Sequence, residues 1–266
     1  MKPLKMAATL AGTLLMAGQL QANVTVNPVG SDGAGTGLQT ELNSRVTPAA
    51  GDTWNPGTLS GSDYINGTVQ NNQSPLTALW TLTGAGSSAT IVLEIAGNAG
   101  ANTFGFYDPS SPGTTQAQLF NGPAAAGSKV YLKFSGNQLQ SSLDNLIWAN
   151  VAKGGFSSTT FGMYLSGPGG TFFSDGAGSQ NLVAYQGFDG RTITIGANPE
   201  AWDANSYVIG WEDLPLSQSD LDYQDMVLLV SEVVPVPEPT TIIAGALLLL
   251  PLGASTLRVL RRNRAA

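Results

Sequence analysis

The chain has 266 residues, of which 18 are acidic and 11 are basic, and it has no histidine and no cysteine. It therefore has no Ser-His-Asp triad, no Cys-His pair, no disulfide, and no imidazole or thiolate metal ligand. All 18 acids lie between residues 23 and 239, and the basic residues there are Arg45, Lys129, Lys133, Lys153 and Arg191, so this part carries a net charge of 5 − 18 = −13. Such a charge repels phosphates and argues against nucleic acid as a partner.

The N-terminal segment, residues 1–22, has the parts of a secretory signal peptide. Lys2 and Lys5 precede an apolar run from Met6 to Ala17, and the small residue Ala22 stands at a plausible cleavage point. An N-terminal membrane anchor is the alternative, but the run is shorter than the roughly 20 residues that a spanning helix needs. We expect signal peptidase to remove residues 1–22 by cleavage after Ala22.

Residues 23–234 are expected to form one exported domain. A short helix is predicted over 36–46, where Leu38, Leu42 and Val46 recur at helical spacing. Short runs rich in β-branched and aromatic residues then alternate with Gly, Asn and Pro turn signals. These runs predict strands at 79–82, 90–95, 103–107, 129–134, 159–165, 182–185, 192–195, 207–211 and 225–230.

Alternation is clearest in the run from Lys129 to Phe134, where Val130, Leu132 and Phe134 share one face and the lysines share the other. One face of this strand should be buried and the other solvated. Short strands separated by turns are typical of an all-β fold, and we predict an antiparallel β-sandwich of jelly-roll type. A closed barrel is the alternative.

Five carboxylates lie close together in the sequence near the end of this domain: Glu212, Asp213, Asp220, Asp222 and Asp225. No basic residue occurs between Arg191 and Arg258. Carboxylates this dense repel one another unless a cation neutralises them, and calcium accepts six to eight oxygen ligands on irregular loops. In an extended backbone Asp220 and Asp222 would face the same side. We predict a calcium-stabilised loop, with a merely solvated or Lys-paired acidic loop as the alternative.

Two carbohydrate-directed readings stay open. A polysaccharide-acting enzyme would need two carboxylates about 5–10 Å apart, such as Glu212 with Asp220 or Asp222, beside an exposed tryptophan. A carbohydrate-binding matrix module would need a flat row of at least two exposed tryptophans. Trp202 and Trp211 are the nearest candidates to the acids.

The C-terminal segment, residues 235–266, has a different character from the domain. Prolines at 235, 237 and 239 predict an extended, accessible strip over 234–239, and an uncharged run follows at 241–257. As a helix this run would span roughly 25 Å, which is just enough for a bilayer core. Four arginines follow and place the C-terminus in the cytoplasm by the positive-inside rule: Arg258, Arg261, Arg262 and Arg264.

This arrangement resembles the PEP-CTERM sorting signal, which combines a Val-Pro-Glu-Pro motif, one hydrophobic helix and an Arg-rich tail. The motif here is Val236, Pro237, Glu238 and Pro239. The resemblance implies processing by an exosortase during transient insertion in the inner membrane of a Gram-negative bacterium. The body would then reach the cell surface or extracellular matrix, often in a cell that makes exopolysaccharide. A permanent tail anchor is the alternative.

The acidic stretch also resembles a domain of unknown function found in exported bacterial proteins. That domain has a strand ending Gly-aromatic-Glu-Asp and a loop Asp-x-Asp-aromatic-x-Asp, as at 210–213 and 220–225 here. Its members often carry a histidine that this chain lacks. The resemblance implies an exported β-domain and no activity. We therefore expect an exported, non-enzymatic surface or matrix protein.

Overall fold

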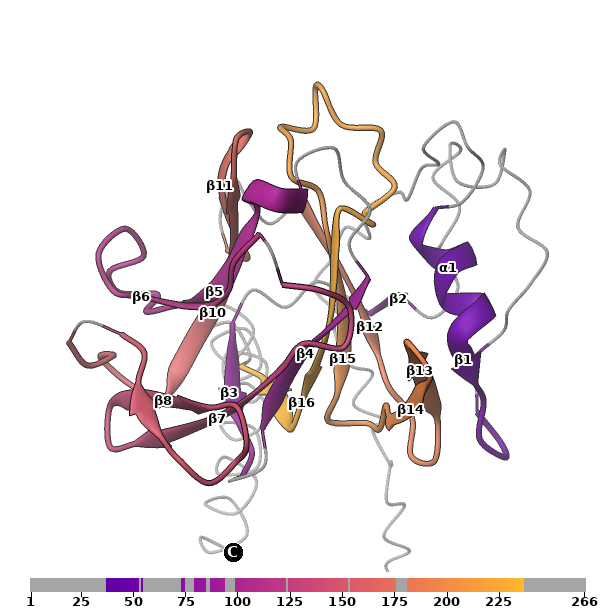
Figure 1. Ribbon diagram of the computed structural model, residues 1–266, viewed down its shortest axis with the longest axis horizontal. Coiled ribbons are helices and arrows are strands. Elements are labelled where there is room, and N and C mark those ends of the chain that lie inside the picture. The colour runs from indigo at the N-terminus through magenta and orange to yellow at the C-terminus, as the bar shows by residue number, and fades with distance from the viewer. Residues whose placement is uncertain are drawn as a thin grey trace, which may run out of the picture.

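A computed structural model describes residues 37–52, 54, 73–74, 79–84, 87–93, 99–122, 124–152, 154–175 and 181–236 (Figure 1). The expected signal peptide with Ala22, the motif residues Pro237 to Pro239, the apolar run 241–257 and the arginines after it lie outside these residues. Within the described ranges, no helix is both long enough and apolar enough to cross a membrane.

The described chain is nearly all β-structure. It contains one α-helix and one short 3₁₀ helix, and its strand pairings are antiparallel. The elements in chain order are α1 (Leu38–Arg45), β1 (Val46–Thr47), β2 (Gln73–Ser74), β3 (Trp80–Leu82), β4 (Ser88–Leu93), η1 (Ala99–Ala101), β5 (Thr103–Tyr107), β6 (Gln116–Phe120), β7 (Lys129–Ser135), β8 (Gln138–Ser142), β9 (Ala149–Asn150), β10 (Thr160–Gly167), β11 (Gly170–Phe173), β12 (Leu182–Gln186), β13 (Thr192–Ile195), β14 (Asn198–Ala201), β15 (Tyr207–Trp211), β16 (Met226–Ser231) and β17 (Val233–Pro235).

The strands of the described residues form three sheets. The largest has the order β2-β12-β15-β16-β4-β7-β8-β9, and two of its inner strands, β15 and β16, which are called the central strands below, are neighbours in both sequence and space. A second sheet has the order β17-β3-β10-β5-β6, with β11 paired to β10. The third joins β1, β13 and β14 and lies beside α1, on the right of Figure 1.

One core lies between the two larger sheets. It is built from alternate residues of the central strands, such as Tyr207, Ile209 and Trp211 of β15, together with Phe104 and Phe106 of β5. Side chains that alternate along a strand face opposite sides, so the remaining residues of the central strands point away from this core.

Those remaining residues form a second core on the other face of the largest sheet. Val208 of β15 and Leu229 of β16 pack there with Leu38 and Leu42 of α1 and with Ile193 of β13. The centre of the largest sheet is therefore covered on both faces. This explains why β15 and β16 are almost continuously apolar rather than alternating.

The nine predicted strands and the predicted helix all occur, and their bounds differ little from those expected. The expected alternation in β7 is observed from Lys129 to Lys133, because Val130 and Leu132 are buried while the two lysines are half-buried. Phe134, expected on the buried face, is half-buried and packs against the core between the two larger sheets. The extended backbone expected over 234–239 is present at its start, but Val234 and Pro235 are half-buried rather than freely accessible. Val234 and Pro235 belong to β17, which pairs with β3 at the edge of its sheet, a place where proline is tolerated.

Candidate metal centre

The acidic residues flank and fill the loop between the two central strands of the largest sheet. Trp211 at the end of β15 is paired with Met226 at the start of β16, so the segment between them closes on itself. This loop, residues 212–225, forms the arch at the top of Figure 1. Because both strands are buried on both faces, the two ends of the loop are anchored in the interior of the fold.

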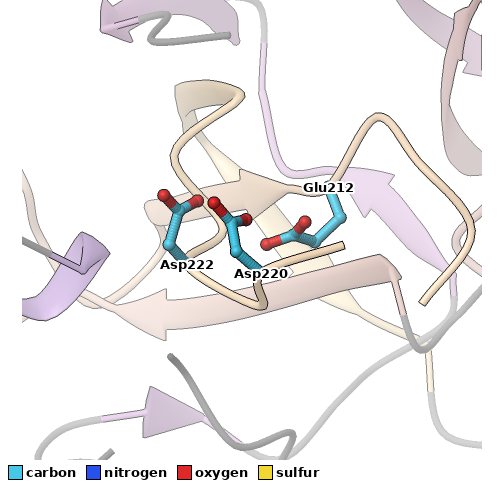
Figure 2. A group of neighbouring side chains, drawn as sticks. All are labelled: Glu212, Asp220 and Asp222. Atoms are coloured by element: carbon cyan, nitrogen blue, oxygen red, sulfur yellow. The ribbon is translucent and has the colours of Figure 1, made fainter. Parts of the chain in front are cut away.

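Three of the five predicted ligands converge. One carboxylate oxygen each from Glu212, Asp220 and Asp222 lie within 4.8 Å of one another. Figure 2 shows the carboxylates of Asp220 and Asp222 next to each other, with the carboxylate of Glu212 extending toward Asp220. Glu212 and Asp222 are 1% and 3% exposed, whereas Asp220 is exposed. The group therefore has a buried floor and an open side.

The backbone reaches this arrangement through left-handed conformations, not through the extended segment that was expected. Leu221 and Tyr223 have φ of 64° and 56°, which is uncommon for such residues. Burial stabilises both, since Tyr223 lies in the second core and Leu221 packs against it. Asp220 and Asp222 do lie on the same side of the loop, as expected (Figure 2). The extended backbone from which this was predicted is wrong, because the chain here is in left-handed conformations.

Gly210 gives the loop room to pack on the sheet. A Cβ atom at this position would lie 2.5 Å from the carbonyl oxygen of Tyr223 and closer still to Cδ2 of Leu38. Asp222 is also fixed to the helix, because its carbonyl oxygen accepts a hydrogen bond from Leu38 N at 3.0 Å. The glycine before Trp211 therefore serves close packing between β15, the acidic loop and α1.

Both carboxylate oxygens of Glu212 accept hydrogen bonds, and yet the pKa of this side chain is raised. Its Oε1 accepts a hydrogen bond from Tyr223 N at 2.6 Å, and its Oε2 accepts one from the Ser219 hydroxyl. Burial raises the pKa of Glu212 to about 7, and the charges of Asp222 and Asp220 add to this against the effect of the two hydrogen bonds. A carboxylate oxygen has more than one lone pair, so both oxygens remain able to bind a cation.

Asp213 and Asp225 do not belong to the converging group. Asp213 is buried and accepts a hydrogen bond from Asn102 Nδ2 at 2.9 Å, while its own N–H donates to Asp225 Oδ2 at 2.8 Å. Burial raises the pKa of Asp225 to about 8, with further contributions from the charges of Asp213, Glu212 and Asp222. These two acids tie the ends of the loop together and add negative charge beside the three-carboxylate group.

Two polar partners of the site were not predicted from the sequence. Ser219 donates to Glu212 and accepts a hydrogen bond from Leu221 N at 2.9 Å, which is the local turn that serine often makes. Its position directly before Asp220 was a usable signal. Asn102 comes from just before β5 in the other large sheet, and nothing in the spacing of the sequence links it to Asp213.

The tryptophans do not support a carbohydrate platform. Trp202 and Trp211 are fully buried, as is Trp80, and Trp54 is 5% exposed. Trp148 is half-buried with the ammonium group of Lys133 over its ring. The row of exposed rings expected for a binding module is therefore absent from these five side chains, and neither Trp202 nor Trp211 is available for stacking beside the acids.

Comparisons with protein-family models, with curated proteins and with solved structures gave no match. The chemistry of the site therefore has to be argued from its own residues. Three carboxylates offer up to six oxygens, all hard ligands, on an irregular loop. This donor set suits calcium, and magnesium less well because magnesium demands a near-ideal octahedron.

Proposed function

We propose that the chain is an exported cell-surface or extracellular-matrix protein, whose body is a non-enzymatic β-sandwich of jelly-roll type stabilised by calcium. Its C-terminal segment serves as a PEP-CTERM sorting signal. After export and cleavage by signal peptidase, an exosortase processes the chain near Val236 to Pro239. Exopolysaccharide is the proposed environment of the released body.

The observation that carries this proposal is the position of the last described strand. Both described cores use residues between Leu38 and Val233, and β17, the last strand in the described residues, ends at Pro235. The Val-Pro-Glu-Pro motif begins at the next residue, Val236, whose N–H donates to Leu79 O at 2.9 Å. Cleavage after this point would remove no described core residue, which is what a sorting signal requires.

The sandwich is supported by the core between the two large sheets, and calcium by the convergence of three acids. Ion pairs in the described part of the chain neutralise other carboxylates, those of Glu41, Glu200 and Asp52. A bound divalent cation would offset the repulsion among Glu212, Asp220 and Asp222. It would add stability to an exported domain that has no disulfide.

The sorting proposal is tested by export in a Gram-negative bacterium that makes an exosortase. The full chain should pass through a membrane-bound form and yield a shorter body outside the cell. Deletion of residues 237–266 should give secretion without the membrane-bound form, and Pro237→Ala/Glu238→Ala should leave the chain membrane-bound and unprocessed. Pro235→Ala, outside the motif, is the matched control. A deletion variant that stays membrane-bound, or a motif variant processed like the parent, would refute the proposal.

A further inference from the structure

An apolar tip projects from the largest sheet between β8 and β9. It consists of residues 143–148, Leu-Asp-Asn-Leu-Ile-Trp. Leu143, Leu146 and Ile147 are 84%, 80% and 78% exposed, and they are the large apolar side chains exposed in the part of the chain that the structure describes. Single exposed leucines are ordinary on soluble proteins, but three on one short loop mark a contact site.

Asp144 fixes the shape of this tip from within. Its Oδ1 accepts hydrogen bonds from Ile147 N at 3.0 Å, from Leu146 N at 2.9 Å and from the Ser142 hydroxyl at 2.8 Å. These bonds lower the pKa of Asp144 to about 2, so the carboxylate stays ionised. The apolar side chains are thus presented on a formed turn, and the charge at its centre is used internally.

The base of the tip has the residue types found at a membrane–water boundary. Trp148 is half-buried, and Nζ of Lys133 lies 4.1 Å from the centre of its ring. Tryptophan and lysine both combine an apolar body with a polar end, and both are favoured where hydrocarbon meets lipid headgroups. The three aliphatic side chains of the tip are more exposed than this pair and extend the apolar surface into solvent.

The segment of sequence that contains the tip also differs in charge from the rest of the body. Residues 109–174 contain Lys129, Lys133 and Lys153 but one acid, Asp144, so their net charge is 3 − 1 = +2 against −13 for the body. Lys129 pairs with Glu200 at 2.7 Å, which leaves this region close to neutral. A segment with this charge balance is repelled by lipid phosphates less than the acidic body as a whole.

The acidic loop lies at the opposite end of the sheet. Ser142, just before the tip, lies in one row of paired residues that crosses the sheet. The row continues through Tyr131 and Ser88 and reaches Ser231 at the end of β16. The acidic loop enters β16 at its other end, Met226. At about 3.3 Å per residue the length of β16 separates the two by more than a Debye length at physiological salt, so the carboxylates are screened from a surface at the tip.

We propose that the apolar tip inserts into the interfacial region of a lipid bilayer and holds the body against the membrane surface. A narrow turn with three outward aliphatic side chains enters lipid without needing a complementary protein pocket. The sequence adds one further argument, and this argument, unlike those above, rests on the proposed sorting signal. The chain reaches the tip's end of the sheet at Ser231, a short distance in sequence before the apolar run that starts at 241.

The test uses residues 23–236, which hold all residues of both described cores and so should fold without the C-terminal segment. The probe is vesicles of phosphatidylcholine with a minority of phosphatidylglycerol. The parent should co-sediment with them, and the emission of Trp148 should shift to the blue and be quenched by brominated lipid. The other tryptophans are buried and give a constant background. Leu146→Asp/Ile147→Asp should weaken vesicle binding by about 100-fold.

Two further variants separate the loss of apolar surface from the addition of negative charge. Leu146→Ser/Ile147→Ser removes apolar surface without adding charge and should also lose binding, whereas Gln118→Asp/Asn198→Asp adds two charges at exposed positions elsewhere and should bind like the parent. Each variant should melt like the parent, because the altered side chains are exposed. A parent that does not bind vesicles, or that forms dimers through the tip instead, would overturn the inference. Vesicle binding by this fragment does not depend on exosortase processing. The membrane-insertion proposal and the sorting proposal can therefore fail independently of each other.

Discussion

The carboxylate of Glu212 and the backbone N–H of Tyr223 are joined by a hydrogen bond of 2.6 Å across the acidic loop. The bond holds a buried acid against a residue in a left-handed conformation, so the ionisation of Glu212 and the shape of the loop are linked. Ionisation of Glu212 should therefore change the free energy of unfolding of the domain.

The first prediction concerns pH without divalent cations. The pKa of Glu212 is raised by burial from 4.5 to about 7, and that of Asp225 from 3.8 to about 8. Between about pH 4 and pH 8 the folded state therefore binds more protons than the unfolded state, so stability falls as the pH rises through this window. For Glu212 alone the loss is on the order of 3 kcal/mol.

Urea unfolding in EDTA at a series of pH values measures this fall. Glu212→Gln removes one ionising group and should flatten the pH dependence. Asp189→Asn is a matched control at an exposed acid and should follow the parent. A parent whose stability is constant or rises between pH 5 and pH 8 would contradict the prediction.

The second prediction concerns the ion pair under the second core. Arg191 forms two hydrogen bonds to the carboxylate of Asp52, and its guanidinium lies 4.7 Å from the ring centre of Trp202 and 5.0 Å from that of Trp54. Asp52→Asn would leave a buried cation without its counter-charge, which should cost about 3–5 kcal/mol. Thermal unfolding measures the loss.

The partly exposed helical pair Arg45–Glu41 provides the control for that experiment. Glu41→Gln should cost less than about 0.5 kcal/mol. The Arg191 bond also holds the pKa of Asp52 at about 2, so its contribution should persist above about pH 4 and disappear as the pH falls toward 2. Equal losses in the two variants would show that Asp52 and Arg191 do not stabilise the domain in the way inferred from their burial.

The third prediction concerns Gly210. An alanine there would press its Cβ against the backbone oxygen of Tyr223, which cannot move without shifting the acidic loop. We expect Gly210→Ala to destabilise the domain by about 1–3 kcal/mol or more. Gly84→Ala, where an added Cβ meets no atom within 4 Å, should be nearly neutral. A Gly210→Ala variant with the melting curve of the parent would show that the loop is not packed as described.

Much of the fold follows from local sequence signals. The nine predicted strands are rich in β-branched or aromatic residues, and Leu38 with Leu42 marks the apolar face of α1. Some strands missed in the prediction are mostly polar, such as β8 with Gln-Leu-Gln-Ser-Ser, and others are apolar but short, such as β11 with Gly-Thr-Phe-Phe and β17 with Val-Val-Pro. Their pairing comes from neighbouring strands of the same sheet, and tertiary context overrides their weak propensity.

The site was predicted less completely than the strands. The density of carboxylates identified the loop, and Asp220 with Asp222 was expected on one side, but nothing in the sequence selected Glu212 over Asp213 and Asp225 as their partner. Glu212 and Asp213 are adjacent, and after a strand adjacent side chains diverge, so one joins the converging group and the other turns to Asn102. The left-handed turns at Leu221 and Tyr223 depend on packing against α1 and the second core. Such long-range contacts have no local sequence signal.

Calcium binding is the central claim about the site, and Asp220 allows its sharpest test. This side chain belongs to the converging group but is exposed, so Asp220→Asn should change the stability of the calcium-free protein little. The measurement is thermal unfolding of residues 23–236 in EDTA and in millimolar calcium, for the parent, Asp220→Asn and the control Asp189→Asn. At 100-fold excess over its dissociation constant, calcium should stabilise the parent and the control by roughly 2.7 kcal/mol. The account predicts that this gain is lost or strongly reduced in Asp220→Asn, whereas no gain in the parent, or the same gain in all three proteins, would contradict it.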